Sequence, residues 1–558
     1  MPAQFVTSAP AGGPDQSPHS AAGDGRRVWR LDWFDAGVLG VLALASLVFL
    51  AVLAIHGGEW TGVEGFIAGD QAQYLSWVRE SGRNLLIGNQ FDIPAGNPVL
   101  LYPPLLASGG LNRLGLPVAA AYLLWKPVGV LVMFFGVRAF VRHLLAGRWE
   151  RRAALVVALF FGPPAAALGI GILGGESSAT LQFIAGETWP VGHLWGYPMT
   201  AIAVGLMPVA FLAANRARAA EAPSWARPGR AAWAGAAAAL AVSWIHPWQG
   251  IILLATVTLA CLWDAWSARD AAQLRTDAAR LWPLVGLGVA PLGAFAILTA
   301  SNASWSRVAE VYRTEFDRWP AWLFVLAMAP LALPALLGYR GRASGWADRV
   351  LRLWAPVDLA LYLAPVGTFP FHAFNGVAVP LGVLAVRGVA PHVRAAAPHR
   401  RRTVAILTAA ALALLVVPAG ADRIRSARTA VAFNVEPYWY SSGERDALDA
   451  LRKDSRAGGV LASPRLGQLV PAAAGRATWA GTVSWTPDFA ARAAAATALM
   501  RGQLGPAAAR RLVRRTRARF ILQDCSQTAD LRRALGTVLL SQRRYGCATV
   551  AVLAPRRR

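Results

Sequence analysis

About 11 apolar runs divide the chain between residues 36 and 418. A hydrocarbon core about 30 Å thick is crossed by a helix of roughly 20 apolar residues, and the runs approach this length. They lie at residues 36–55, 117–145, 153–173, 195–214, 231–245, 250–266, 281–300, 321–337, 350–366, 371–386 and 403–418. The series predicts an all-α polytopic membrane bundle of about 11 transmembrane helices.

The connections between these runs alternate in charge. Arginine clusters occupy residues 148–152, 216–230, 269–280, 340–349 and 387–402. The connections between those clusters are the loop 57–116, the loop with Glu176 and Glu187, the turns IHPWQG and GTFPFH, and residues 301–320. Because arginine and lysine favour the cytoplasmic side, the first set is predicted inside. An odd number of spans then predicts a cytoplasmic N-terminus and an extracytoplasmic C-terminus in the plasma (inner) membrane.

The net charge of +25 would suggest a nucleic-acid partner in a soluble protein. Here charged residues make up only 15% of the chain, against about 25% in soluble proteins, and the arginines lie between the apolar runs. We therefore expect the lipid bilayer as partner and no nucleic acid. The only lysines are Lys126 and Lys453, and the abundance of Arg, Ala and Gly indicates a GC-rich bacterial genome.

Three regions are predicted. Residues 1–35 are rich in Pro, Gly and Ser and are expected to form a disordered cytoplasmic tail. Residues 36–420 hold the membrane domain. Residues 421–558 alternate short apolar segments with helical ones, which is typical of a small α/β domain, here extracytoplasmic. In an oxidising compartment Cys525 and Cys547 of this domain could form a disulfide, the alternative being two reduced, buried thiols.

The loop 57–116 carries the most informative acid. Asp70 lies in the sequence GDQAQYLSWVRES, directly before an amphipathic stretch. Its simplest role is to cap that helix.

The stretch GDQAQYLSWVRES, the stretch LLYPPLLASGGLNRLGLP and the C-terminal stretch VLASPRLGQLVPAAAGRATWAGTVSWTPD together resemble the GT-C superfamily, which includes the protein mannosyltransferases. The resemblance implies an inverting glycosyltransferase that moves a sugar from a polyprenyl-phosphate carrier to a glycan or protein of the cell envelope. It implies Asp70 as base and Tyr74 as a substrate-binding residue. Many members carry paired acids at this position, whereas Gln71 follows Asp70 here, so the need for a divalent metal, Mg or Mn, stays open.

Transfer from a lipid phosphate also calls for positive charge near the departing phosphate. Lys126, inside an apolar run, is one candidate, and the alternative is that it snorkels to the headgroups. Arg307 and Arg313 are two more, and the alternative for them is salt bridging with neighbouring acids such as Glu310 at helical spacing.

Further candidates lie in the other outer connections. Glu187, and after it Glu176, could supply a second acceptor-side carboxylate or a metal ligand, or either could be a solvated loop acid. His246 and Trp248 in WIHPWQG could contact a sugar, or the histidine could cap a tight turn. A different class of function, a transporter or flippase of lipid-linked sugars or a noncatalytic assembly protein, is the alternative. A transporter is expected to show two related halves, and the sequence shows no such repeat.

Overall fold

The computed structural model describes residues 30–169, 172–220, 225, 228–314, 317–364, 369–434, 436–527 and 529–555. Most of the predicted tail, residues 1–29, lies outside this part, and its last residues already belong to the first helix. Asp32 caps that helix and forms a capping box with Asp35.

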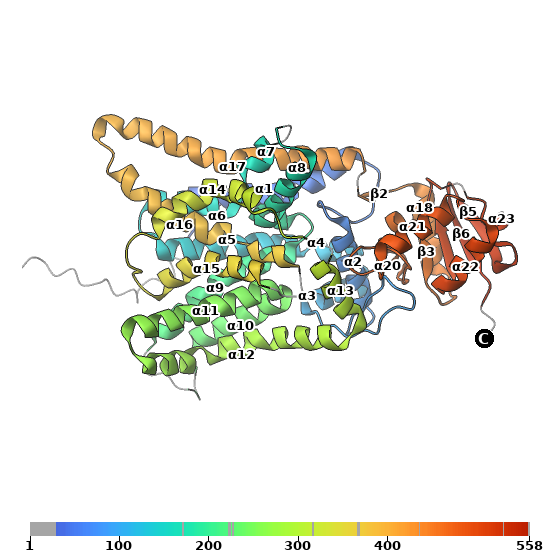
Figure 1. The fold of residues 1–558 in the computed structure, drawn as a ribbon, viewed down its shortest axis with the longest axis horizontal. Coiled ribbons are helices and arrows are strands. Elements are labelled where there is room, and N and C mark those ends of the chain that lie inside the picture. Colours follow the sequence, from blue (N-terminus) through green and yellow to red (C-terminus); the bar gives the residue numbers. More distant parts are fainter. Residues whose placement is uncertain are drawn as a thin grey trace, which may run out of the picture.

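Helices make up most of the described part of residues 33–432 (Figure 1). They are α1 (Trp33–His56), α2 (Ala68–Ser81), α3 (Pro103–Arg113), α4 (Val118–Leu123), α5 (Trp125–Leu144), α6 (Arg148–Phe160), α7 (Pro164–Leu168), α8 (Gly175–Thr188), α9 (Pro198–Ala219), α10 (Arg230–Ile245), α11 (Pro247–Ala268), α12 (Ala271–Ser301), α13 (Ala303–Thr314), α14 (Ala321–Gly338), α15 (Trp346–Leu363), α16 (Ala378–Arg394) and α17 (Arg401–Ala432), with 3-10 turns η1 (Pro190–Leu194), η2 (Pro370–Phe374) and η3 (Pro398–Arg400).

Eight helical segments of the described chain are long and apolar enough to cross a membrane. They coincide with eight of the predicted runs. The other three runs are also helical but fall short: Gly162 and Pro163 interrupt residues 153–173, α10 has only 16 residues, and α15 carries charged residues along its length, among them Arg352 and Asp358. Charge inside hydrocarbon is costly, so length and polarity separate these three from the rest.

Small residues let the long helices approach closely. A Cβ at Gly136 of α5 would lie only 2.0 Å from the carbonyl oxygen of Gly205 of α9. Such contacts are typical of helix packing in membranes, where van der Waals contact replaces the hydrophobic effect. An alanine at either position would push the two helices apart.

The C-terminal domain, residues 439–555, carries a four-stranded sheet in the order β3-β4-β6-β5. β3 and β4 are parallel and the remaining pairs antiparallel. Its elements are β2 (Trp439–Tyr440), α18 (Ser442–Lys453), β3 (Val460–Ala462), α19 (Pro464–Gly467), α20 (Val470–Ala474), α21 (Phe489–Met500), α22 (Pro506–Thr516), β4 (Phe520–Gln523), α23 (Leu531–Leu535), η4 (Gly536–Val538), β5 (Leu539–Tyr545) and β6 (Ala548–Leu553). A disulfide joins Cys525 to Cys547. The domain starts later than residue 421 because α17 continues to Ala432.

The loop 57–116 lies between the bundle and the C-terminal domain. β1 (Glu59–Trp60) pairs antiparallel with β2, and the side-chain amide of Asn89 donates to the carbonyl oxygen of Trp485 at 2.9 Å. Figure 1 shows the domain at one end of the bundle, with α2, α3 and α13 beside it. These contacts fix α2, and with it Asp70, at the junction.

Candidate active site

Asp70 lies in the first turn of α2, near the positive end of the helix dipole. The helix N-cap is Ile67, and no side chain makes a capping hydrogen bond there. The interpretation that Asp70 caps this helix is therefore wrong, because Asp70 lies inside the first turn. Its carboxylate is half-buried, and His372 and Glu187 lie within electrostatic reach of it.

Glu187, near the end of α8, is the centre of a hydrogen-bond network. The side-chain amide of Asn375 donates to its Oε2 at 2.8 Å, and Nδ1 of His372 lies 3.1 Å from the same oxygen. Burial raises the pKa of Glu187, but the hydrogen bonds and charge of these partners outweigh it and leave the pKa below its usual range. Glu187 is thus held as a buried carboxylate. Glu176, at the start of α8, is exposed.

His246 lies beside this network. Its ring centroid is 5.1 Å from that of His372, and the amide of Gln249 donates to the carbonyl oxygens of His372 and Asn375 at 2.9 and 3.1 Å. The first turn of α11 therefore holds the His372 turn in place. Trp248 is buried in α11, which favours a packing role for its ring.

The carboxyl of Asp70 titrates near neutrality. Burial raises its pKa most, the charge of His372 lowers it and that of Glu187 raises it, with a result of about 6. Glu436, in the segment between α17 and the C-terminal domain, has its pKa raised to about 7 by burial and by Asp70. Burial lowers the pKa of His193 to about 4. A carboxylate with a pKa near the working pH is suited to general-base catalysis.

Aromatic side chains close this region. Tyr74 stacks on Tyr122 with ring centroids 5.8 Å apart. From α13, the hydroxyl of Tyr312 donates to Oγ of Ser484 of the C-terminal domain at 3.0 Å. Residues from the loop, the bundle and the C-terminal domain thus meet around Asp70.

Lys126 has a different environment from the one expected. Its Nζ lies 2.6 Å from Oε1 of Glu64 and donates to the carbonyl oxygen of Ser46 at 2.9 Å, with both charged groups buried. The interpretation that Lys126 snorkels to the headgroups is wrong, because its ammonium group is buried and paired with Glu64. Because its charge is already neutralised by a carboxylate, Lys126 is poorly placed to bind a phosphate.

Three arginines that could bind a phosphate differ in their surroundings. Arg313 forms an ion pair with Glu310, as the salt-bridge alternative predicts, and Arg307 is exposed on the same helix. Arg423 of α17 is buried. Its guanidinium donates to the carbonyl oxygen of Gln182, and it lies over the ring of Phe66 at 5.3 Å. It also lies 3.6 Å from the place that a Cβ at Gly186 would take, next to Glu187.

Over the described residues, no group of three His, Cys, Asp or Glu side chains is arranged to hold a metal ion. The Mg or Mn site stays a prediction without a ligand set.

Sequence reasoning did not assign His372, Asn375, Glu436, Glu64 or Arg423. His372 and Asn375 belong to the turn GTFPFH and the residues after it, which the charge pattern placed on the same side as Asp70. Their polarity at the start of the apolar run 371–386 was the available signal. Glu436 and Arg423 carry no such signal, because they follow the last apolar run.

Comparison with known proteins rests on structure. No protein-family model matches the chain, and no curated protein sequence matches it significantly. Arabinofuranosyltransferase AftD from Mycobacteria has a TM-score of 0.55 at 15% identity over 95% of this chain, which spans 40% of AftD. ArnT from Cupriavidus metallidurans bound to undecaprenyl phosphate has a TM-score of 0.52 at 14% identity, over 94% of this chain and 98% of ArnT.

The archaeal oligosaccharyltransferase AglB from Archaeoglobus fulgidus, in complex with an inhibitory peptide and a dolichol-phosphate, is similar over 88% of this chain and 70% of its own, with a TM-score of 0.51 and 13% identity. These proteins are GT-C glycosyltransferases. The chain has the GT-C fold. At these identities the fold is what the GT-C likeness establishes, and the chemistry has to be argued from the residues around Asp70.

Proposed function

We propose that the chain is a membrane glycosyltransferase that moves a sugar from a polyprenyl-phosphate carrier to an envelope glycan or protein outside the cytoplasm. The observation that carries the proposal is Asp70, a carboxyl with a pKa of about 6 beside Glu187 and His372, at the junction of a GT-C bundle and its C-terminal domain. The charge pattern of the connections supports an extracytoplasmic position for this junction.

In the proposed reaction an acceptor hydroxyl attacks the anomeric carbon of the sugar. The carbon–oxygen bond to the carrier phosphate breaks on the opposite face, so the configuration inverts. The hydroxyl proton passes to the carboxylate of Asp70, and the bonding electrons leave with the polyprenyl phosphate. Glu187, held by Asn375 and His372, is placed to orient the acceptor, and Tyr74 and His246 are candidate sugar contacts.

We infer that Arg423, rather than Lys126, supplies positive charge for the leaving phosphate. Its side chain is buried, and over the described residues it forms no ion pair with a carboxylate. Its guanidinium lies beside Gly186 of α8, the residue before Glu187. A planar guanidinium can donate two hydrogen bonds to a phosphate. Arg307 and Arg313 stay candidates for contacts further along the carrier.

The test compares Asp70→Asn with wild-type protein in liposomes. Labelled polyprenyl-phosphate sugars are supplied with envelope material from the host, and incorporation of the label is measured. Loss of a general base is expected to lower the rate by about 10²- to 10⁴-fold. Asp317→Asn changes an exposed acid of an outer connection and is expected to keep the wild-type rate.

An unchanged rate in a folded Asp70→Asn protein would overturn the proposal. Movement of the intact lipid-linked sugar across the liposome membrane, with no sugar transfer, would instead support the transporter alternative.

A further inference from the structure

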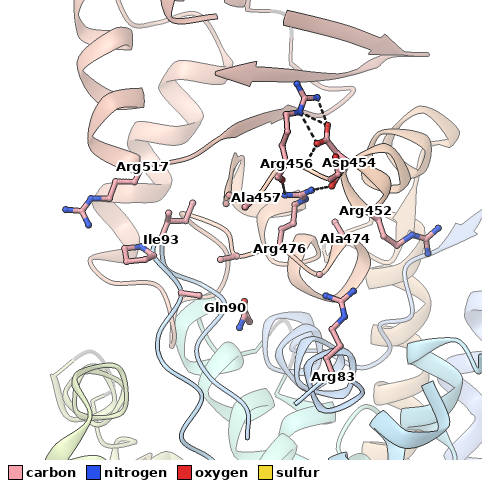
Figure 2. Close-up of a pocket in the computed structure, with 17 residues that line it drawn as sticks. Arg83, Gln90, Ile93, Arg452, Asp454, Arg456, Ala457, Ala474, Arg476 and Arg517 are labelled. Carbon is pink, nitrogen blue, oxygen red and sulfur yellow. Dashed lines mark hydrogen bonds and ion pairs between the residues drawn. The ribbon is translucent and has the colours of Figure 1, made fainter. Parts of the chain in front are cut away.

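A second polar feature lies away from Asp70. Part of the loop 57–116 and the C-terminal domain line an open cavity of about 640 Å³ (Figure 2). Its charged lining residues are Arg83, Arg452, Arg456, Arg476, Arg517 and Asp454. Five arginines against one aspartate leave a charge of +4. Such a concentration of one sign attracts anions.

The arginines of this cavity have different amounts of free hydrogen-bonding capacity. Arg476 donates to the carbonyl oxygens of Leu451, Arg456 and Gly458 at 2.7, 2.7 and 3.1 Å, so it holds the cavity wall. Arg456 is paired with Asp454. Arg83 and Arg517 are exposed, and neither has a carboxylate partner within the described part of the chain. These two are the free donors.

Arg79, next to this cavity, is repelled by the positive charge of neighbouring arginines. Burial lowers its pKa most, and repulsion from Arg83 and Arg452 lowers it further, to about 10. A bound anion would relieve this repulsion.

The lining also says what kind of anion fits. None of its residues belongs to the eight candidate membrane spans, and Ile93 is its only long apolar side chain, so acyl chains have no groove to occupy. The described lining has no aromatic ring, which removes the stacking that favours nucleic-acid bases.

Arg79 and Arg83 lie near the last turn of α2, whose first turn carries Asp70. Nine residues of helix separate Asp70 from Arg79, about 14 Å at 1.5 Å per residue. A saccharide chain could therefore extend from one to the other. We propose that the cavity binds an anionic glycan, through its carboxylate or phosphate groups, as the distal part of the acceptor. This identification of the acceptor rests on the proposed function.

The experiment measures binding rather than transfer. Full-length protein in phosphatidylcholine nanodiscs is titrated into a fluorescent oligogalacturonate, and anisotropy is recorded. A neutral dextran oligosaccharide of similar size is the second probe. We expect the acidic probe to bind, more weakly as salt is raised, and the neutral one to bind at least about tenfold more weakly.

The double substitution Arg83→Gln and Arg517→Gln is expected to lower the affinity for the acidic probe by at least about tenfold. Neither residue has a carboxylate partner, so the change leaves no acid unpaired. The matched control is Arg511→Gln with Arg514→Gln, which removes the same charge from exposed positions of α22 and should change affinity by less than about twofold.

Equal affinities of the wild type and R83Q/R517Q, or equal binding of the two probes, would overturn the assignment. A competition by anionic lipid would also overturn it. In that case phosphatidylglycerol in the nanodiscs would abolish probe binding by the wild type and leave probe binding by R83Q/R517Q unchanged, because the cavity would then take lipid headgroups. Asp70→Asn should bind the acidic probe as the wild type does. Loss of transfer and loss of probe binding therefore report on the proposed function and on the cavity separately.

Discussion

Glu64 and Asp70 lie six residues apart in the same loop, yet their surroundings are opposite. Glu64 is fully buried and paired with Lys126 at 2.6 Å. Asp70 is half-buried and has another carboxylate, Glu187, within electrostatic reach. Burial raises the pKa of both carboxyls. The ion pair with Lys126 engages Glu64 and holds the loop on the bundle, whereas Asp70 forms no ion pair over the described residues and is available for proton transfer. The difference shows that acidic character alone does not identify a catalytic residue.

The largest effect on stability is expected at the pair. Lys126→Met would leave the carboxylate of Glu64 buried without its partner, which typically costs about 3 to 5 kcal/mol. Thermal unfolding in detergent measures the loss. Adding Glu64→Gln removes the unpaired charge and should restore much of the stability; a double variant no better than Lys126→Met would mean that the pair is not what stabilises the loop.

Asp70→Asn is expected to raise the stability of the folded protein, whereas Lys126→Met lowers it. The pKa of Asp70 is about 6 in the folded protein against its ordinary value of 3.8, so the folded state binds the extra proton and loses stability as the pH rises through this window. At pH 7.5 the amide should therefore stabilise the protein, by at most about 3 kcal/mol at 1.36 kcal/mol per pKa unit.

The gain from Asp70→Asn should be small at pH 4, close to the ordinary pKa of 3.8, and should vanish below about pH 3, where the wild-type carboxyl is protonated in both states. A stabilisation that is the same at pH 4 and pH 7.5 would show that the cause is packing rather than charge.

Arg423→Gln tests the phosphate partner. Loss of a charge-assisted hydrogen bond of about 1.5 to 3 kcal/mol should raise the KM for the polyprenyl-phosphate donor by about 10- to 100-fold. Arg425→Gln, two residues along α17, removes an arginine that is paired with Asp422 and serves as control. Equal effects of the two variants would remove Arg423 from the donor site.

The smallest effects concern the pH profile. Because Glu187 raises the pKa of Asp70 and His372 lowers it, Glu187→Gln should move the acid limb of kcat/KM to lower pH. His372→Ala should move it to higher pH. Shifts of the same sign in both variants would contradict the arrangement of charges around Asp70.

Much of the architecture follows from apolar length and the position of arginine. Those patterns predicted helices at all the apolar runs and a C-terminal α/β region, because both depend on neighbours along the chain. Asp70 and Glu187 were also expected on one side of the membrane. The structure places them within electrostatic reach of each other.

The partners of these residues could not be predicted. Lys126 and Glu64 are 62 residues apart, and Glu187 and Asn375 are 188 residues apart. Each pairing depends on how the helices cross, which an apolar pattern does not specify. The arginine cavity has the same origin, since Arg83 and Arg476 meet only when the C-terminal domain packs on the end of α2.

The transfer rate as a function of pH, for wild-type protein and Asp70→Asn, tests the central claim most directly. With a labelled polyprenyl-phosphate sugar as donor, the wild-type rate should fall below a midpoint of about pH 6, because protonated Asp70 cannot accept the acceptor proton. Asp70→Asn should keep only a small rate without that midpoint. An Asp70→Asn protein with the wild-type rate and the same acid limb would show that Asp70 is not the base.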